Sequence, residues 1–189
     1  PYSVVKGDND TALIMIRNAQ NIRMQSKDYK GAVGAALTLS YIYKETGKID
    51  SAYNAIYKAL DLTSKFDDNS GLLALLYIEL ADLRSQSGDL KESKKLYNTA
   101  LKLGSEIKNE DVIIRALNGI ANHFEKVSQI DSSLQYNLQL NKILQTKGDY
   151  LSLCSNYINI AVCFTQMDSP KKALSFYKKS LSLYDTLEL

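Results

Sequence analysis

The side chains that most often perform catalysis are scarce in this sequence. His123 is the only histidine, and stretches of similar pattern carry apolar residues at the matching position. An imidazole can act as a general base or a metal ligand, but a position that is otherwise apolar favours a histidine packed in the core. No HExxH, CxxC, phosphate-binding loop or dinucleotide-binding motif occurs. We therefore predict no enzyme activity, no cofactor and no metal site.

The two cysteines offer little redox chemistry. Cys154 and Cys163 are nine residues apart on one predicted helix, so they face opposite sides about 13 Å apart along the axis and cannot bond to each other. Each is best interpreted as a small buried apolar residue. Two unpaired thiols slightly favour a reducing compartment such as the cytoplasm, although a periplasmic sensor region is compatible with the sequence.

The charged residues exclude two further classes of function. The lysine pairs Lys94–Lys95 and Lys171–Lys172 could attract an anion, but a solvated helix face is the default interpretation. The net charge of +2 is spread along the chain, without the concentrated basic face that phosphate backbones require, so this region is not expected to bind nucleic acid directly. The longest apolar run, 72–78, falls short of the roughly 20 residues that span a bilayer, so no membrane insertion is expected.

A repeat of 40 or 41 residues organises the elements that carry these side chains. Aligned turn positions are occupied by Gly7, Gly47, Gly88, Ser128 and Asp168. A small residue follows each turn, at Ala12, Ala52, Ser93, Ser133 and Ala173, and an apolar residue precedes it, at Leu39, Leu80, Ile120 and Ile160. Both belong to helical stripes of period 3.6. Plausible N-caps of the first helices are Asp28, Asp68, Asn109 and Asp149, which predicts helices of 16 to 18 residues.

This pattern resembles the tetratricopeptide repeat family, and the stretch LSYIYKETGKIDSAYNAIYKAL from Leu39 follows the family signature nearly throughout. The resemblance implies an all-α, right-handed solenoid of antiparallel helix pairs, with about four complete repeats and one leading half-repeat. The period exceeds the usual 34 residues of the family. Extended units of this kind resemble the regulatory and sensor regions of bacterial signalling proteins.

One solenoid domain is expected over residues 1–189. The expected units are 1–27, a half-repeat, then 28–67, 68–108, 109–148 and 149–189. The sequence begins in mid-repeat and without methionine, so we expect a fragment of a longer protein. At the other end, Leu181, Leu183 and Leu187 would lack a following helix. Either the native chain continues, which we favour, or the end helices self-associate with another subunit.

The resemblance also implies where a ligand would bind. In the family a concave groove is lined by the first helices, and the corresponding positions here include Tyr41, Lys44, Asp82, Arg115, Asn118, Asn122, Glu125 and Thr165. Asn118 and Asn122, one helical turn apart, could hold an extended backbone through paired hydrogen bonds, and Arg115 could bind a carboxylate. We predict a protein or peptide segment in this groove; a groove that is merely solvated is the alternative.

One departure from the signature bears on the groove. Arg84 replaces an aromatic residue at a packing position, so either its aliphatic stem lies along the interface or it pairs with Glu79 or Asp82.

Together these features predict a non-catalytic, protein-binding module. We expect it to be the sensor or recognition region of a longer bacterial signal transduction protein, such as a histidine kinase or a transcriptional regulator. The alternative is a free-standing scaffold or assembly adaptor that joins protein partners.

Overall fold

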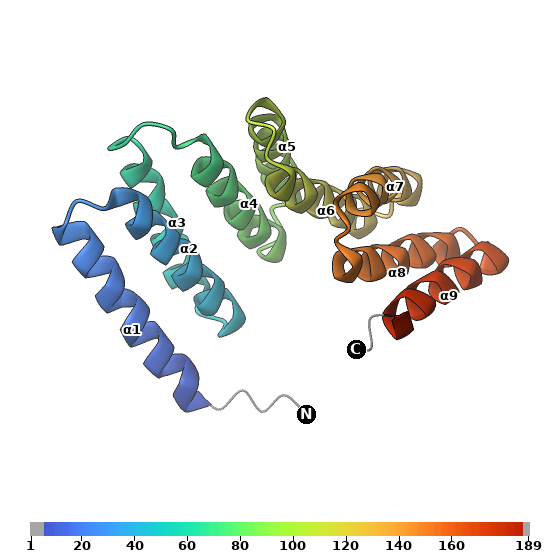
Figure 1. The fold of residues 1–189 in the computed structure, drawn as a ribbon, viewed down its shortest axis with the longest axis horizontal. Helices are drawn as coiled ribbons and strands as arrows, with labels where there is room; N and C mark the ends of the chain where they lie inside the picture. Colours follow the sequence, from blue (N-terminus) through green and yellow to red (C-terminus); the bar gives the residue numbers. More distant parts are fainter. Residues whose placement is uncertain (1–5, 187–189) are drawn as a thin grey trace. The chain divides into compact units, whose positions relative to one another are not determined.

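Helices are the regular elements of this protein. The computed structural model describes residues 6–186, with side chains from residue 11 onward, and contains no strand in that range. The helices are α1 (Lys6–Gln25), α2 (Tyr29–Glu45), α3 (Ile49–Thr63), α4 (Ser70–Gln86), α5 (Leu90–Glu106), α6 (Glu110–Lys126), α7 (Ile130–Lys147), α8 (Tyr150–Gln166) and α9 (Pro170–Thr186). They belong to two compact units, Pro1–Lys108 and Asn109–Leu189, within which successive helices run antiparallel (Figure 1). The predicted all-α architecture of a leading helix and four helix pairs is confirmed.

The second helix of each pair begins where the repeat predicts, at Ile49, Leu90, Ile130 and Pro170. The prediction of a turn at Gly7 is wrong, because α1 starts at Lys6 and runs through it. The first N–H groups of a helix need no partner within the helix, so a glycine in the first turn does not force the chain out of it.

Side-chain caps begin most of the first helices. Three predicted caps accept a hydrogen bond from the backbone N–H three residues later, at 2.9 to 3.2 Å: Asp28, Asn109 and Asp149. Asp68 was also predicted to cap a helix, and that prediction is wrong. Its φ of 53° places it in the preceding turn, and Asn69 is the N-cap of α4 instead. The Asn69 amide donates to the Thr63 carbonyl at 2.7 Å, which closes the longer connection between α3 and α4.

Fully buried alanines mark the places where helices cross. Ala32, Ala36, Ala52, Ala59, Ala74, Ala81, Ala116, Ala121 and Ala161 all have 0% exposure. Larger buried side chains fill the space between them, including Ile56, Leu76 and Leu83 in the first unit and Leu117, Ile120 and Ile160 in the second. Each unit therefore has an apolar core of its own, built from the small and large positions that the repeat specifies.

The turns within the helix pairs share one backbone conformation. Gly47 and Gly88 have φ of 72° and 86°, and the residues that replace glycine, Ser128 and Asp168, have φ of 58° and 50°. This left-handed conformation costs a residue with a β-carbon about 1–2 kcal/mol of conformational free energy, whereas glycine adopts it without that cost. The two non-glycine turns keep the geometry of the repeat but carry local strain.

We predict opposite effects for one substitution at two glycines. Gly47→Ala should lower the free energy of unfolding by about 1 kcal/mol, because alanine is strained at positive φ. Gly34→Ala, inside α2 where a new β-carbon meets no atom within 4 Å, should raise it by about 0.5–1 kcal/mol. Ser128→Gly should be neutral to stabilising. Urea unfolding followed by circular dichroism measures all three, and equal effects at Gly47 and Gly34 would contradict the explanation.

Candidate functional site

The predicted binding residues divide between the two units. Tyr41 and Lys44 lie on α2 and Asp82 on α4, all in the first unit. The second unit contains the other five: Arg115, Asn118, Asn122 and Glu125 on α6, and Thr165 on α8. Each unit therefore carries its own group of candidate residues, and the two groups differ in chemistry.

In the first unit the candidate charges pair with each other. Lys44 Nζ lies 3.2 Å from Glu79 Oε2 and 3.4 Å from Asp82 Oδ2, and only 16% of the Lys44 side chain is exposed. The Tyr97 hydroxyl donates a hydrogen bond to the other oxygen of Asp82. This network joins α2, α4 and α5. Lys44 and Asp82 therefore hold helices together. The sequence did not reveal this role, because the partners Glu79 and Tyr97 lie on α4 and α5, far along the chain from Lys44 on α2.

Protonation states in this network follow from its burial and charges. Burial alone would lower the pKa of Lys44, but Glu79 and Asp82 outweigh that effect and raise it above its ordinary value. Burial and the neighbouring Asp82 carboxylate raise the pKa of Tyr97 far above its usual range. Lys44 is therefore charged and Tyr97 neutral near pH 7. Tyr41 differs from both because it is 54% exposed, and its ring centroid lies 5.5 Å from Lys44 Nζ.

In the second unit the candidate amides face solvent. Asn122 is exposed and Asn118 partly exposed, and neither amide hydrogen-bonds to another residue within the described range. Arg115 is exposed but has an interaction within the molecule. Glu125 Oε1 accepts a hydrogen bond from Gln166 Nε2 at 3.4 Å, which links α6 and α8. Thr165 is exposed and donates to the Ala161 carbonyl at 3.0 Å.

A buried polar network joins α7 and α8. Asn156 Nδ2 donates to Asn137 Oδ1 and Asn141 Nδ2 donates to Asn156 Oδ1, both at 3.1 Å. Asn137 also donates to the Ser133 carbonyl at 3.1 Å, and Cys163 Sγ lies 3.5 Å from Ser133 Oγ. These residues are at most 9% exposed. Sequence reasoning missed the network, although Asn137, which replaces an aromatic residue of the repeat signature, was a signal of it.

The single histidine and the cysteines are structural, as predicted. His123 is 6% exposed and meets Phe124 edge to face, with ring centroids 5.5 Å apart. Cys154 and Cys163 are buried and unbonded, and burial raises the pKa of the Cys163 thiol. A buried neutral thiol is a poor nucleophile. No cluster of three metal-ligating side chains occurs among the residues that the structure describes.

Arg84 pairs with a tyrosine and not with an acid. Its Nη2 donates to the Tyr57 hydroxyl at 2.8 Å, while Glu79 and Asp82 bind Lys44. The proposed pairing with those acids is therefore wrong. One repeat earlier, Arg17 Nε donates to the Tyr43 hydroxyl at 2.8 Å. Arg17 aligns with Tyr57, and Tyr43 aligns with Arg84. Two successive junctions therefore contain a hydrogen bond between an arginine and a tyrosine, with the two residue types in exchanged positions.

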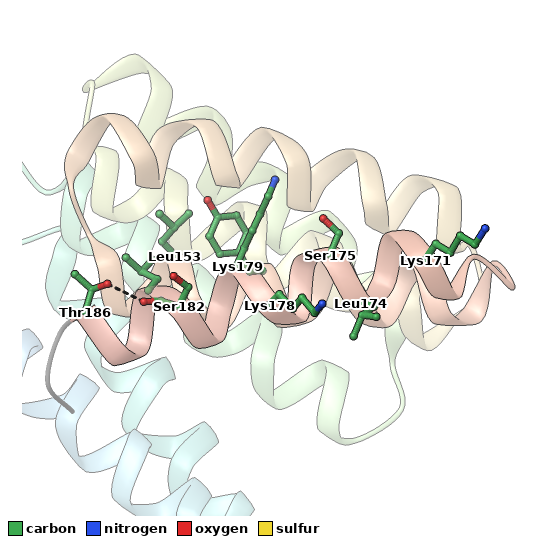
Figure 2. A pocket seen from close by; sticks show the side chains of 10 residues that line it. Leu153, Lys171, Leu174, Ser175, Lys178, Lys179, Ser182 and Thr186 are labelled. Atoms are coloured by element: carbon green, nitrogen blue, oxygen red, sulfur yellow. Dashed lines mark hydrogen bonds between the residues drawn. The ribbon is translucent and has the colours of Figure 1, made fainter.

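The last helix pair has hollows on two sides. One, of about 700 Å³, is lined mostly by α9, including Lys171 and Lys178 (Figure 2). Lys171 and its neighbour Lys172 are exposed, as predicted for a solvated face. The other, of about 440 Å³, is lined mostly by apolar and aromatic residues of α8 and α9, together with Ser155 and Ser180. Leu181 there is 61% exposed, in agreement with a face that no helix covers. Tyr177 aligns with the buried Tyr97 of an earlier repeat but is 40% exposed on this face.

The class of protein follows from this arrangement: a helical-repeat protein that presents the side chains of its helices to solvent. Residues 33–66 and 74–103 match the family model of the tetratricopeptide repeat. These two segments are tetratricopeptide repeats, and the described helices continue the same antiparallel pairing on either side of them. No helix in the described range is both long and apolar enough to cross a membrane.

Solved structures share the fold at low sequence identity. Aspartyl phosphate phosphatase F from Bacillus subtilis is 14% identical, with a TM-score of 0.84 over 94% of this chain and 46% of that one. A signal transduction ATPase (STAND) with a tetratricopeptide repeat sensor, from Pyrococcus horikoshii, is 14% identical, with a TM-score of 0.76 over 92% of this chain and 26% of that one. BtubC from P. vanneervenii is 14% identical, with a TM-score of 0.66 over 98% and 93%.

The chain thus spans less than half of the first two of these proteins. No curated protein matches its sequence.

We predict that Lys44 stabilises the first unit in a pH-dependent way. Lys44→Gln leaves Glu79 and Asp82 without their cation and should cost about 2 kcal/mol, below the cost of a fully buried pair because Asp82 is 34% exposed. The pKa of Lys44 is higher in the folded state than in the unfolded state. Its contribution to stability is therefore complete at a pH below the ordinary lysine pKa of about 10.4, and it is lost as the pH rises past the pKa of the folded state.

Urea unfolding of the wild type and Lys44→Gln at neutral and strongly alkaline pH measures this effect. The difference in their free energy of unfolding should shrink at alkaline pH. Lys30→Gln, at an exposed position of the same helix, is the matched control and should change stability by less than about 0.5 kcal/mol. A constant difference across the pH range would rule out the ion pairs as its cause.

The bonds between arginine and tyrosine at the two successive junctions lead to a second prediction. Tyr57→Arg and Arg84→Tyr should each cost about 1 kcal/mol, because each single change places two like groups together. The double variant copies the arrangement of Arg17 and Tyr43 and should recover to within about 0.5 kcal/mol of the wild type. A double-mutant cycle of thermal unfolding tests this, and strictly additive losses would show that the two residues do not interact.

Proposed function

We propose that this chain is a non-catalytic module that binds a protein or peptide segment on the exposed faces of its first helices, with α6 as the centre of the site. The observation that carries the proposal is the pair of amides on α6, Asn118 and Asn122, which packing leaves available. An asparagine amide offers two donors and one acceptor, which suits the alternating N–H and C=O groups of an extended backbone.

Nearby side chains on α6 and α8 suit the same kind of ligand. Arg115 lies one turn before Asn118 and can bind a carboxylate, while Glu125 lies one turn after Asn122 and can accept from a basic side chain. On α8, Ile158 is 44% exposed and offers an apolar contact. In the first unit Tyr41 is the candidate contact, because Lys44 and Asp82 already bind each other.

A non-enzymatic role agrees with the repeats and the site. Tetratricopeptide repeats generally serve as protein-interaction modules. The described histidine and cysteines are buried in the helix packing, so neither the imidazole nor the thiols are presented to a substrate.

We further propose that the module is the sensor region of a longer bacterial signalling or regulatory protein. The support is its similarity in fold to parts of a phosphatase and of a STAND protein with a tetratricopeptide repeat sensor. A free-standing adaptor is the second candidate, favoured by the alignment with 93% of BtubC. Kinase or helix-turn-helix motifs in the complete gene would support the sensor, and a coding sequence ending near Leu189 would support the adaptor.

Selection from a displayed peptide library, followed by titration of the selected peptide, tests the site. We expect Asn118→Ala/Asn122→Ala to weaken binding at least about tenfold, because two backbone hydrogen bonds are lost. Asn98→Ala, at an exposed position on the second helix α5, is the matched control and should leave the affinity unchanged. Equal binding by all three proteins would exclude α6 as the site.

A further inference from the structure

A polar groove in the first unit shares no residue with the proposed site on α6. It has a volume of about 300 Å³ and is formed by α1, α2 and α3. Its lining residues are Arg17, Gln20, Asn21, Leu39, Tyr43, Ser51, Asn54, Ala55 and Lys58. Two of them are cations and none is an acid. The groove is therefore positively charged and rich in hydrogen-bond donors.

The donors in this groove exceed the acceptors that its own residues supply. Arg17 Nε and Nη2 both donate to the Tyr43 hydroxyl, whose residue is 5% exposed and forms the floor. With both lone pairs occupied, that hydroxyl must direct its own proton elsewhere. Arg17 Nη1 and Lys58 Nζ have no partner among the described residues. An acceptor, and preferably an anion, would satisfy all of these groups.

The next repeat differs in charge at two positions that align with residues of this groove. At the positions that align with Asn21 and Ser51, the junction of α3, α4 and α5 carries Asp61 and Glu92. Glu92 Oε1 lies 3.6 Å from Lys95 Nζ, so an acid at this aligned position pairs with a lysine of the same helix. The first groove keeps two cations but has an amide and a hydroxyl in place of the two carboxylates.

We propose that the groove of α1, α2 and α3 binds carboxylate side chains of an acidic segment in a protein partner. Arg17 and Lys58 supply the positive charge, the Tyr43 hydroxyl donates from the floor, and Asn21 and Ser51 leave open the places that acids occupy in the next repeat. A volume of about 300 Å³ accommodates one or two carboxylate side chains. The site is independent of the proposed peptide site on α6.

The probe is a short polyglutamate peptide, capped at both ends and fluorescently labelled, with polyglutamine of equal length as the neutral control. Anisotropy titration of the full chain should show saturable binding of polyglutamate that weakens as salt is added, and no binding of polyglutamine. Absence of saturable binding by polyglutamate would overturn the proposal.

The decisive variant introduces the acids that the next repeat carries at the aligned positions. Asn21→Asp/Ser51→Glu should weaken polyglutamate binding at least about tenfold, because the protein then supplies its own carboxylates. Asn21→Gln/Ser51→Thr keeps the charge and should bind as the wild type does, and Lys58→Gln should weaken binding about threefold. Circular dichroism would establish that the variants are folded, and unchanged affinity in Asn21→Asp/Ser51→Glu would overturn the assignment.

A final measurement distinguishes an acidic segment from a free anion. Inorganic phosphate added alone is followed through the side-chain amide signals of Asn21 and Asn54 in NMR spectra. We expect phosphate to bind at least about tenfold more weakly than the peptide, because it makes one contact where the peptide makes several. Phosphate binding as tight as peptide binding would mean that the ligand is a small anion, against the proposal.

Discussion

The close approach of neighbouring helices is the constraint on which the rest of this protein depends. It requires small residues where helix axes cross, and Ala52, Ala59, Ala116 and Ala121 are completely buried at such places. Neither helix of a pair can bury its apolar stripe alone, so each pair needs the next one. The positions left over, between the small and the bulky residues, are free to vary. The polar contacts described above use those variable positions and also signature positions where the usual residue is replaced, such as Arg84 and Asn137.

The junctions between helices show how much that freedom allows. In the first unit an arginine and a tyrosine bond at two successive junctions with their places exchanged, and a buried lysine holds two carboxylates nearby. In the second unit asparagine amides take the corresponding role between α7 and α8. One backbone arrangement is therefore held by three different kinds of polar contact, each in addition to the same apolar packing.

Sequence reasoning predicted the fold well because its signals are local and repeated. The period placed the starts of α3, α5, α7 and α9, since one turn conformation recurs whatever the residue, as Ser128 shows. It failed at Asp68, where a longer connection shifts the cap by one residue. The polar contacts were less predictable, because they join residues far apart in the sequence. Lys44, for example, binds Glu79, which lies 35 residues further along the chain. Comparing aligned positions could have revealed the bond between Arg84 and Tyr57, which repeats an earlier pair in reverse.

The amide network between α7 and α8 has a consequence for how such a protein can evolve. Repeat proteins grow by duplication of units, which works when any unit can follow any other. Here Asn156 is accommodated only because Asn137 and Asn141 face it. A copy of α8 and α9 placed after α3 would set that amide against Ile56 and Leu60, which align with Asn137 and Asn141 and offer no side-chain hydrogen bond. The polar contacts therefore restrict which unit can follow which. A recombined chain that separated the paired amides would be less stable.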